Sequence, residues 1–143
     1  MDDRPLEWSR GSWLVSTRRD RLNFDAVLTL LRATPWGHAV SADRLRPAMA
    51  NSLCFGVYEG PATIGFARVV TDLATYGYLT DVVVAEAWRG RGIGTWLTEC
   101  IMAHPELQGV RRLALLTRDA EALYARAGFV RGAEPLVYME RRP

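Results

Sequence analysis

The segment from Val82 to Leu97 (VVVAEAWRGRGIGTWL) constrains the fold of this chain more than any other part of its sequence. Three consecutive valines predict a buried strand. The glycine-rich turn Arg89–Gly94 follows and leads directly into a helix. Apolar residues of this helix recur at the three-and-four spacing of one buried face, at Ile93, Trp96, Leu97, Cys100 and Ile101.

A strand, a glycine turn and a helix start together form a receptor for an anion. Several backbone N–H groups surround one point, no side chains crowd them, and the positive end of the helix dipole lies behind them. Arg89 and Arg91 lie within the turn and can add charge-assisted hydrogen bonds to the anion. We therefore predict that the turn binds a pyrophosphate.

Two classes of phosphate-binding loop do not fit this turn. A P-loop NTPase requires a lysine after its last glycine, and all 18 basic residues of this chain are arginine. A dinucleotide site requires G-x-G-x-x-G after the first strand of a βαβ unit. Gly90 and Gly92 supply two glycines, but Thr95 stands in place of the third, and the preceding pattern predicts a strand meander. The first class is excluded and the second is disfavoured.

The composition predicts an ordinary globular protein. We expect residues 1–143 to form one domain, because this length can bury a substantial core. A net charge of +2 does not predict nucleic-acid binding. No apolar run approaches the roughly 20 residues of a membrane span, and the acidic first residues do not resemble a signal peptide. We therefore expect a cytoplasmic protein with neither a nucleic-acid nor a membrane partner.

The cysteines and histidines do not predict a metal site. Cys54 falls in a strand pattern and Cys100 on a helix face, so both are expected to be core thiols in a reducing compartment. His38 and His104 are far apart, and no CxxC pair is present. The sequence therefore predicts a metal-free protein.

Hydrophobic periodicity and turn residues predict the order of the elements, which indicates an α/β fold built on a mixed sheet. Asn23 is expected to cap the first helix, and Pro47 to kink or divide the second. Strands are expected at 12–17, 53–58, 62–70, 78–84, 112–117 and 136–140, and helices at 24–32, 41–50, from 93 onward, and at 119–127.

A second motif lies in TRDAEALYARAGFV, from Thr117 to Val130. Here Asp119 is expected to cap a short helix and Gly128 to end it, while Leu123 and Ala127 face the core. Tyr124, one turn before the helix end, would in isolation be interpreted as a core tyrosine.

Together the two motifs resemble the signatures of the GNAT N-acyltransferases, and most closely those of a widespread group of small bacterial members. Arg89, Gly92 and Gly94 fill the fixed positions of the acyl-CoA loop Q/R-x-x-G-x-G/A. The second signature, N-x-x-A-x-x-L-Y-x-x-x-G-F, is matched at Ala120, Leu123, Tyr124, Gly128 and Phe129. Thr117 stands where asparagine is commonest, which weakens one hydrogen bond to the pantetheine arm. The resemblance covers nearly the whole chain and is weakest before about residue 50.

The resemblance implies a fold, a reaction and a donor site. The fold is a mixed, mostly antiparallel central sheet with helices on both faces and a splay between the two strands that receive acyl-CoA. The reaction is direct attack of a primary amine on acetyl-CoA in a ternary complex, without a metal. The residues implied for binding acetyl-CoA are Val82, Val83, Val84, Arg89, Gly90, Arg91, Gly92, Ile93, Gly94, Thr95, Thr117 and Ala120.

The resemblance also implies catalytic groups. Tyr124 looks like the general acid that protonates the departing CoA thiolate. Asp81 lies in YLTD, where polyamine-type members carry YLED, so Thr80 replaces a glutamate. One hypothesis is that Asp81 recognises or deprotonates the acceptor amine. The alternative is a strand aspartate paired with an arginine such as Arg68.

The acceptor is left undefined by the sequence. Its pocket is expected between the segment containing Trp36 and His38 and the strand ends near Tyr78, although Trp36 is equally expected to plug the core. An anionic wall favours polyamines or aminoglycosides, whereas exposed Arg68 or Arg118 favours amino acids or peptides with a carboxylate. A protein amine is also compatible, as are a monomer and a homodimer.

Two other functions compete with acetyl transfer. One is a non-catalytic CoA-binding regulatory or interaction domain on the same fold, because fold does not fix function. The presence of Tyr124 and Asp81 disfavours it. The other is a dinucleotide-dependent oxidoreductase, which predicts binding of NAD and not of CoA.

Overall fold

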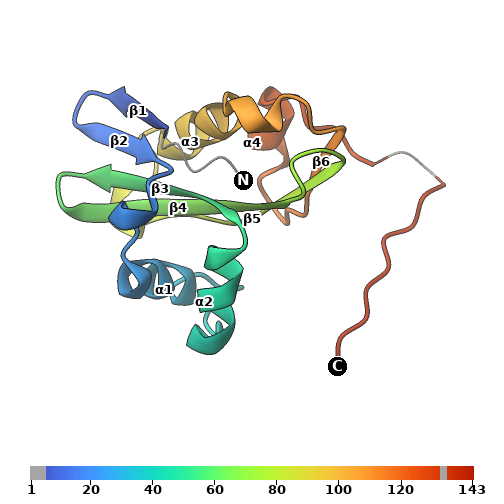
Figure 1. The fold of residues 1–143 in the computed structure, drawn as a ribbon, viewed down its shortest axis with the longest axis horizontal. Coiled ribbons are helices and arrows are strands. Elements are labelled where there is room, and N and C mark those ends of the chain that lie inside the picture. The colour runs from blue at the N-terminus through green and yellow to red at the C-terminus, as the bar shows by residue number, and fades with distance from the viewer. Residues whose placement is uncertain (1–5, 133–134) are drawn as a thin grey trace.

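A computed structural model of the chain describes residues 6–132 and 135–143. Its helices and strands alternate much as the sequence predicts (Figure 1). They are β1 (Glu7–Arg10), β2 (Trp13–Ser16), α1 (Phe24–Arg32), α2 (Ala42–Ala50), β3 (Leu53–Glu59), β4 (Ala62–Thr71), β5 (Tyr76–Val84), α3 (Ile93–Met102), β6 (Arg112–Leu115) and α4 (Glu121–Arg126). Short 3₁₀ turns cover Arg19–Arg21, Glu86–Trp88 and Pro105–Leu107.

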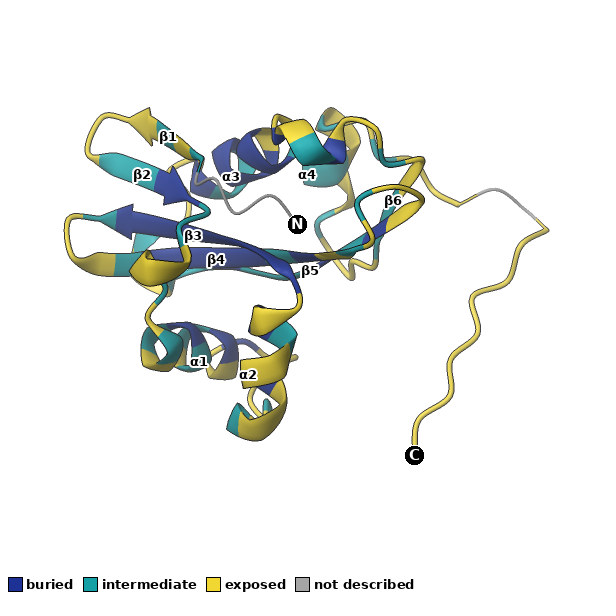
Figure 2. Cartoon of the chain, in the orientation of Figure 1, coloured by how far each residue is buried: buried dark blue, intermediate teal, exposed yellow. Residues whose placement is uncertain are grey.

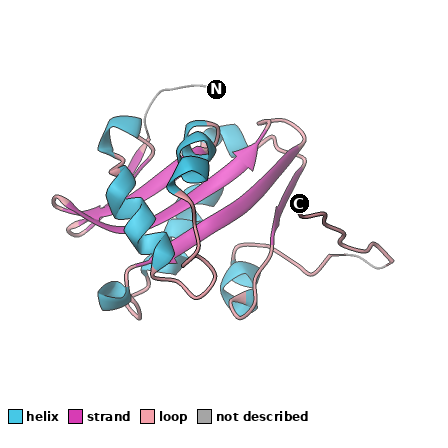
Figure 3. Cartoon of the chain, turned by 90° about the horizontal axis from the view of Figure 1, so that it is seen from below, coloured by secondary structure: helices cyan, strands magenta, loops and turns pink. Residues whose placement is uncertain are grey.

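The strands form one sheet (Figure 3). Their order in it is β1-β2-β3-β4-β5-β6. Every neighbouring pair is antiparallel except β5 and β6, which are parallel. Helices α1 and α2 cover one face, and α3 and α4 lie on the other (Figure 1). The predicted α/β fold, with a mixed, mostly antiparallel sheet and helices on both faces, is confirmed.

The core lies in two layers, one on each side of the sheet (Figure 2). The apolar face predicted for α3 is buried against β3, β4 and β5, in the same cluster as the fully buried Phe55 and Ile64. On the opposite face, Val27 and Leu31 of α1 pack with Phe66 of β4. Burial of these side chains is what holds the sheet rigid beneath the site.

The first two helices begin and end close to where they were predicted. Asn23 caps α1 by accepting a hydrogen bond from the Ala26 N–H at 3.1 Å, as expected. Helix α2 is not divided at Pro47 but continues through it to Ala50. The guanidinium of Arg19 donates to the carbonyls of Met49 and Ser52 at 3.0 and 2.8 Å, which stabilises the end of this helix.

Strand β1 was missed by the sequence analysis. Its four residues are mostly exposed and contain one good strand former, Trp8, so they carry no alternating pattern. The strand forms because its backbone pairs with that of β2. The pairing runs from Glu7 opposite Ser16 to Arg10 opposite Trp13.

The start of α4 differs from its prediction. Asp119 does not cap the helix, which begins two residues later, at Glu121. The local bond is instead made by the Thr117 hydroxyl, which accepts from the Ala120 N–H at 3.0 Å. The threonine hydroxyl thus makes the local side-chain bond that was expected of the aspartate.

The last predicted strand, 136–140, is wrong for this structure. These residues have no strand assignment, and the four large apolar side chains from Leu136 to Met139 are 65–84% exposed. The strand-forming composition was correctly identified, but a strand also needs a neighbour for its N–H and C=O groups. Within the described chain this segment has none.

Both cysteines are buried and free, as predicted. Burial raises the pKa of Cys54 and that of Cys100 to about 11. No helix in the described residues combines the length and apolar character needed to cross a membrane.

The buried thiols predict a loss of stability at alkaline pH. A thiol in the unfolded chain ionises at about pH 8.5. Below this pH both states hold the thiols neutral, and the stability is complete. As the pH rises from there toward about 11, only the unfolded state loses its thiol protons, so the folded state becomes less stable. We expect a decrease of several kcal/mol in unfolding free energy over this range, because both thiols contribute. Urea titrations should show a smaller decrease in the Cys54→Ala/Cys100→Ala variant. An equal decrease in both proteins would contradict the assignment.

Candidate acyl-CoA and amine site

The parallel strands β5 and β6 separate part-way along their length. They pair from Tyr76–Arg112 to Leu79–Leu115, where β6 ends, while β5 continues to Val84. On its β6 side, the Thr80–Val84 stretch therefore has no strand partner among the described residues. This confirms the predicted splay and leaves backbone groups of β5 able to pair with an extended ligand.

A β-bulge lies at the splay. Arg68 pairs with Thr80 and Phe66 with Val83, so two residues of β5, Asp81 and Val82, oppose the single residue between them on β4. Asp81 has a φ of +56°, a left-handed conformation that aspartate tolerates better than most residues. The bulge bends β5 and redirects its side chains at this point. The sequence pattern held no signal for it.

The glycine turn places open backbone at the start of α3. Gly90 and Gly92 have φ values of +78° and +84°, and an added Cβ at either position would meet no atom within 4 Å. Gly92 is the N-cap residue, and no described side chain caps the helix. The first N–H groups of α3 are therefore available to an anion, as the sequence predicted.

Arg89 and Arg91 are both held against the loop. Arg89 donates from Nε to the carbonyl oxygen of Val84 at 2.9 Å, which ties the turn to the end of β5. The guanidinium of Arg91 lies 4.7 Å from the ring centroid of Trp88. Both side chains are exposed, so the remaining guanidinium N–H groups can reach a phosphate.

Tyr124 is positioned by the end of α4. The N–H of Phe129 donates to the Tyr124 carbonyl and that of Gly128 to the Ala125 carbonyl, each at 3.1 Å. With Gly128 at φ +96°, this is a Schellman motif, and the helix end predicted at this glycine is confirmed. The rings of Tyr124 and Phe129 pack edge to face with centroids 6.1 Å apart. Burial raises the pKa of Tyr124 above its ordinary value.

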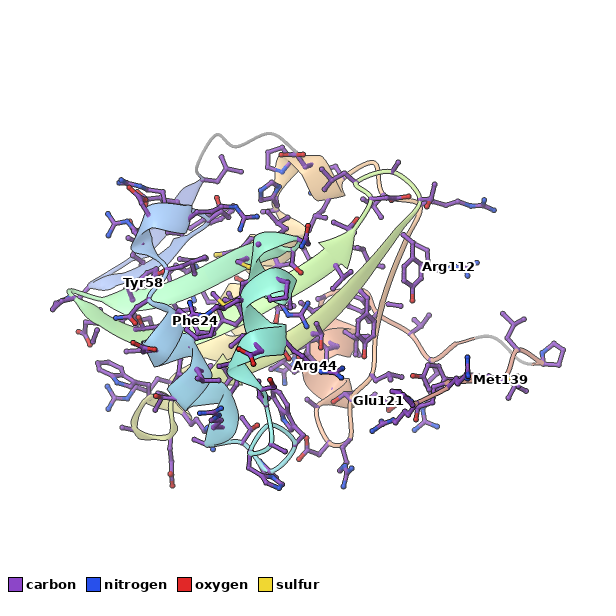
Figure 4. The ribbon with its side chains drawn as sticks, turned by 60° about the horizontal axis from the view of Figure 1, so that its bottom comes forward. Phe24, Arg44, Tyr58, Arg112, Glu121 and Met139 are labelled. Carbon is purple, nitrogen blue, oxygen red and sulfur yellow. The ribbon has the colours of Figure 1, made fainter. Side chains whose placement is uncertain are left out.

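A groove of about 770 Å³ runs between β6 and α4. Thr117 and Tyr124, both predicted site residues, line it together with Glu121 (labelled in Figure 4). Leu123 of α4 instead approaches α3 and the end of β5: a Cβ at Gly94 would lie 3.6 Å from Leu123 Cδ1 and 4.0 Å from Val84 Cγ2. Helices α3 and α4 and the end of β5 therefore meet at the first turn of α3.

Asp81 is ion-paired with Arg68. The Arg68 Nε lies 2.6 Å from the Asp81 Oδ2, and both side chains are only 15–16% exposed. Arg68 also donates from Nη1 to the Ser52 hydroxyl at 3.1 Å, which links the bulge to the end of α2. The alternative interpretation, a strand aspartate paired with Arg68, thus describes the contact that this structure contains. The ion pair uses Oδ2 of Asp81 and leaves Oδ1 of the same carboxylate without a hydrogen bond to any described residue.

The predicted acceptor residues are only partly brought together. Tyr78 and Asp81 lie three residues apart on β5. Burial raises the pKa of Tyr78, and the nearby Tyr76 and Asp81 add to the rise. Trp36 is 56% exposed and does not plug the core. His38 is exposed and bonds through Nδ1 to the Pro35 carbonyl at 3.0 Å. No hydrogen bond, ion pair or ring contact joins Trp36 or His38 to Asp81 or Tyr78 within the described chain.

Comparisons with known proteins decide the family. The GNAT acetyltransferase domain model matches residues 50–131, which contain both sequence motifs. The chain belongs to the GNAT acetyltransferases.

Two relatives match this acetyltransferase over most of its length. A Gibberella zeae protein named as a candidate acetyltransferase is 34% identical over 146 residues, covering 86% of this chain and 81% of the relative. The crystal structure of a candidate GNAT acetyltransferase from Xanthomonas campestris is 39% identical with a TM-score of 0.86, covering 94% and 96% of the two chains. Mouse N-alpha-acetyltransferase 80 is 37% identical over 86 residues, which are 57% of this chain and 27% of that protein.

The protein is accordingly an N-acetyltransferase of the family that uses acetyl-CoA as co-substrate. The residues present fit that co-substrate: an uncapped helix start behind two open glycines, and an unpaired strand edge beside it. In the described residues no group of three or more His, Cys, Asp or Glu side chains is placed to hold a metal ion.

Gly92→Ala is expected to weaken acetyl-CoA binding. An alanine methyl would enter the open space in front of α3, and the left-handed φ would cost about 1 kcal/mol of stability. We expect the KM for acetyl-CoA to rise several-fold. Gly60→Ala is a matched control, because Gly60 also has a positive φ and open space but lies in the distant β3–β4 turn. Equal KM values in the two variants would contradict the binding role.

Proposed function

We propose that this enzyme transfers the acetyl group of acetyl-CoA to a primary amine by direct attack in a ternary complex. The observation that carries the proposal is the splay of β5 from β6, which opens beside the uncapped start of α3 and is flanked by Tyr124. Holding both reactants at one splay makes the reaction effectively unimolecular, which can contribute about 7–11 kcal/mol.

On the donor side, the backbone supplies most of the contacts. The first N–H groups of α3, with Gly90 and Gly92, would bind the pyrophosphate, and Arg89 and Arg91 would add charge. The free edge of Val82–Val84 would align the pantetheine as an added strand. One of its N–H groups would donate to the thioester carbonyl as negative charge develops there. Thr117 and Ala120 would contact the same arm, since the Thr117 hydroxyl can still donate a hydrogen bond.

Tyr124 would give its proton to the departing thiolate. Free thiols and phenols have pKa values of about 8.5 and 10, so the thiolate is the weaker base and needs the phenol chiefly as a hydrogen-bond donor. Burial raises the pKa of Tyr124, which keeps the phenol protonated at neutral pH. Neither Cys54 nor Cys100 is required, because no covalent enzyme intermediate forms.

On the acceptor side, Asp81 would hold the amine and pass its proton through water. Its Oδ1 is left for this role while Oδ2 is bound to Arg68. Tyr78 would lie beside it, and Trp36 and His38 would cover the pocket from the α1–α2 loop. The chemical class is a primary amine: a small amine, an amino acid, a polyamine or aminoglycoside, or a protein amine. Similarity to a mouse N-alpha-acetyltransferase over part of the chain makes peptide α-amines worth including among the acceptors tested.

An amine panel tests the proposal. The protein is incubated with acetyl-CoA and each amine in turn, peptides included, and release of free thiol is measured. Amine-dependent thiol release supports the proposal. A rise in melting temperature with acetyl-CoA but no thiol release across the panel would instead support the non-catalytic CoA-binding function. Stabilisation by NAD and not by acetyl-CoA would contradict both.

A further inference from the structure

One half of the sheet face that carries α1 and α2 is left uncovered. Val27 of α1 packs in one cluster with Phe66 of β4, which is fully buried, whereas Ala67 and Val69 belong to the core on the other face. Alternate residues of a strand share a face, so Val70 lies on the face of Phe66, yet it is 43% exposed. The two helices therefore cover this face beneath one end of the sheet and leave its β5–β6 end open (Figure 1).

Two tyrosines of β5 complete an apolar surface on this open half. Tyr78 pairs directly with Val70, and Tyr76 lies two residues before Tyr78, so all three side chains share the face. Tyr76 is 44% exposed and Tyr78 is half-buried. We call Val70, Tyr76 and Tyr78 the tyrosine shelf. Large apolar side chains that adjoin one another and stay exposed are typical of a surface that binds a ligand.

The shelf leads to the carboxylate of Asp81. Arg68, two residues before Val70, lies on the same face, and its bond to Asp81 Oδ2 brings that carboxylate to the same side. Oδ1 accepts no hydrogen bond from a described residue, whereas every buried side-chain oxygen and nitrogen of the described chain has a partner. The unbonded Oδ1 is therefore reached by solvent. An amine bound there would have the shelf beside it, because Tyr78 lies three residues, or roughly 10 Å, along β5.

The charges on the open half suit an acceptor with a single amine. Its strand positions carry one carboxylate in the described chain, that of Asp81. They carry two guanidinium groups, those of Arg68 and of Arg112, which is exposed and pairs with Tyr76. A second ammonium group on the acceptor would thus meet guanidinium groups of like charge, which lowers its affinity.

The C-terminal segment does not supply a second carboxylate for such an amine. Burial raises the pKa of Tyr78, and Glu140 is among the groups that add to the rise. The Glu140 carboxylate is, however, already paired: its Oε1 lies 3.4 Å from the Nε of Arg142. The free Oδ1 of Asp81 is therefore the carboxylate oxygen that the shelf offers to an amine.

We propose that the acceptor is a primary monoamine with an apolar or aromatic group, bound with its amine at Asp81 and that group on the tyrosine shelf. The inference rests on the proposed function and names its substrate class. The amine nitrogen forms the amide bond as the thioester C–S bond breaks. The nitrogen gives up a proton through water to Asp81, and the thiolate takes the proton of Tyr124. Tyr78 is then the residue that selects the acceptor, and polyamines and aminoglycosides are poor acceptors.

Three amines that share one butyl chain test the shelf. Butylamine ends in a methyl group, 4-phenylbutylamine in an aromatic ring, and 1,4-diaminobutane in a second ammonium group. We expect kcat/KM with acetyl-CoA to be about tenfold higher for 4-phenylbutylamine than for butylamine, because its ring is buried against the tyrosine rings. The diamine should be the poorest acceptor of the three.

Variants of the shelf should change this order. Tyr78→Ala should lower kcat/KM for 4-phenylbutylamine about tenfold, mainly through KM, and for butylamine by about threefold or less, because butylamine has no ring. Tyr78→Phe keeps the ring and should restore the native value. Val70→Glu adds a carboxylate to the shelf and should make the diamine a better acceptor than 4-phenylbutylamine. Ala62→Glu, exposed at the other end of β4, is the matched control and should keep the native order. An unchanged KM for acetyl-CoA would show that each variant still folds.

The outcomes separate the shelf from the proposed function. A native preference for the diamine over 4-phenylbutylamine would overturn the shelf, and so would equal losses for butylamine and 4-phenylbutylamine in Tyr78→Ala. Transfer to peptides or other amines of the panel, but to none of these three, would do the same. In each of these cases acetyl transfer itself would stand. Absence of transfer to any amine would overturn the proposed function, and the shelf with it.

Discussion

Tyr124→Phe is expected to lower kcat by about 100-fold, the lower range for loss of a general acid. The substitution removes one oxygen. The phenylalanine ring keeps the edge-to-face contact with Phe129, and the Schellman bonds that end α4 are made by the backbone. We therefore expect the KM for acetyl-CoA to change less than twofold and the melting temperature by about one degree. Single-turnover acetylation of the best amine from the panel measures the effect on chemistry.

Tyr58→Phe is the matched control. Tyr58 is a buried tyrosine of β3 whose pKa burial raises to about 12, and it lies far from α4, as the labels of Tyr58 and Glu121 show (Figure 4). Loss of this phenol should leave kcat unchanged. An unchanged kcat in Tyr124→Phe, with chemistry rate-limiting, would remove Tyr124 as the acid.

The pH profile gives an independent check on Tyr124. Since burial raises its pKa above the ordinary value of about 10, the acid form persists throughout the neutral range. The kcat of the native enzyme should therefore show no loss from phenol ionisation below about pH 10. A decrease in kcat with an apparent pKa near 8, present in the native enzyme and absent in Tyr124→Phe, would contradict this expectation. It would show that the Tyr124 phenol loses its proton at a lower pH than a buried phenol should.

The donor half of the site was largely predictable from the sequence because local rules determine it. Glycines at positive φ, a helix start and a Schellman ending depend on residues close together in the chain. Gly92 and Gly128 therefore lie where their motifs indicated. Their spacing also carried the family resemblance, which supplied Tyr124.

The acceptor half was not predictable to the same degree because it depends on contacts distant in sequence. The bulge at Asp81 follows from how β4 and β5 pair, and the Arg68–Ser52 bond joins a strand to a helix end. Trp36 shows the same limit, since no local pattern decides whether a turn aromatic faces the core or solvent. The failed strand at 136–140 has the related cause that strands require partners.

Asp81→Asn is expected to reduce stability as well as activity. It would leave the Arg68 guanidinium, only 16% exposed, without its carboxylate. Removing one member of a mostly buried ion pair leaves the other charge poorly compensated, at a cost of about 2 kcal/mol in unfolding free energy. Urea unfolding measures this. Asp20→Asn, in the exposed Arg18–Asp20 pair, should leave the unfolding free energy nearly unchanged and serves as the control.

A double-mutant cycle separates the structural role of Asp81 from a catalytic one. Arg68→Met breaks the same ion pair but keeps the carboxylate. If Asp81 only supports the bulge, then Arg68→Met and Asp81→Asn should reduce kcat/KM for the acceptor by similar factors, and the two losses should not add. If Asp81 also binds or deprotonates the amine, Asp81→Asn should lose at least tenfold more kcat/KM than Arg68→Met. The Arg68→Met/Asp81→Asn double variant should then recover stability and not activity, because only the carboxylate can meet the amine.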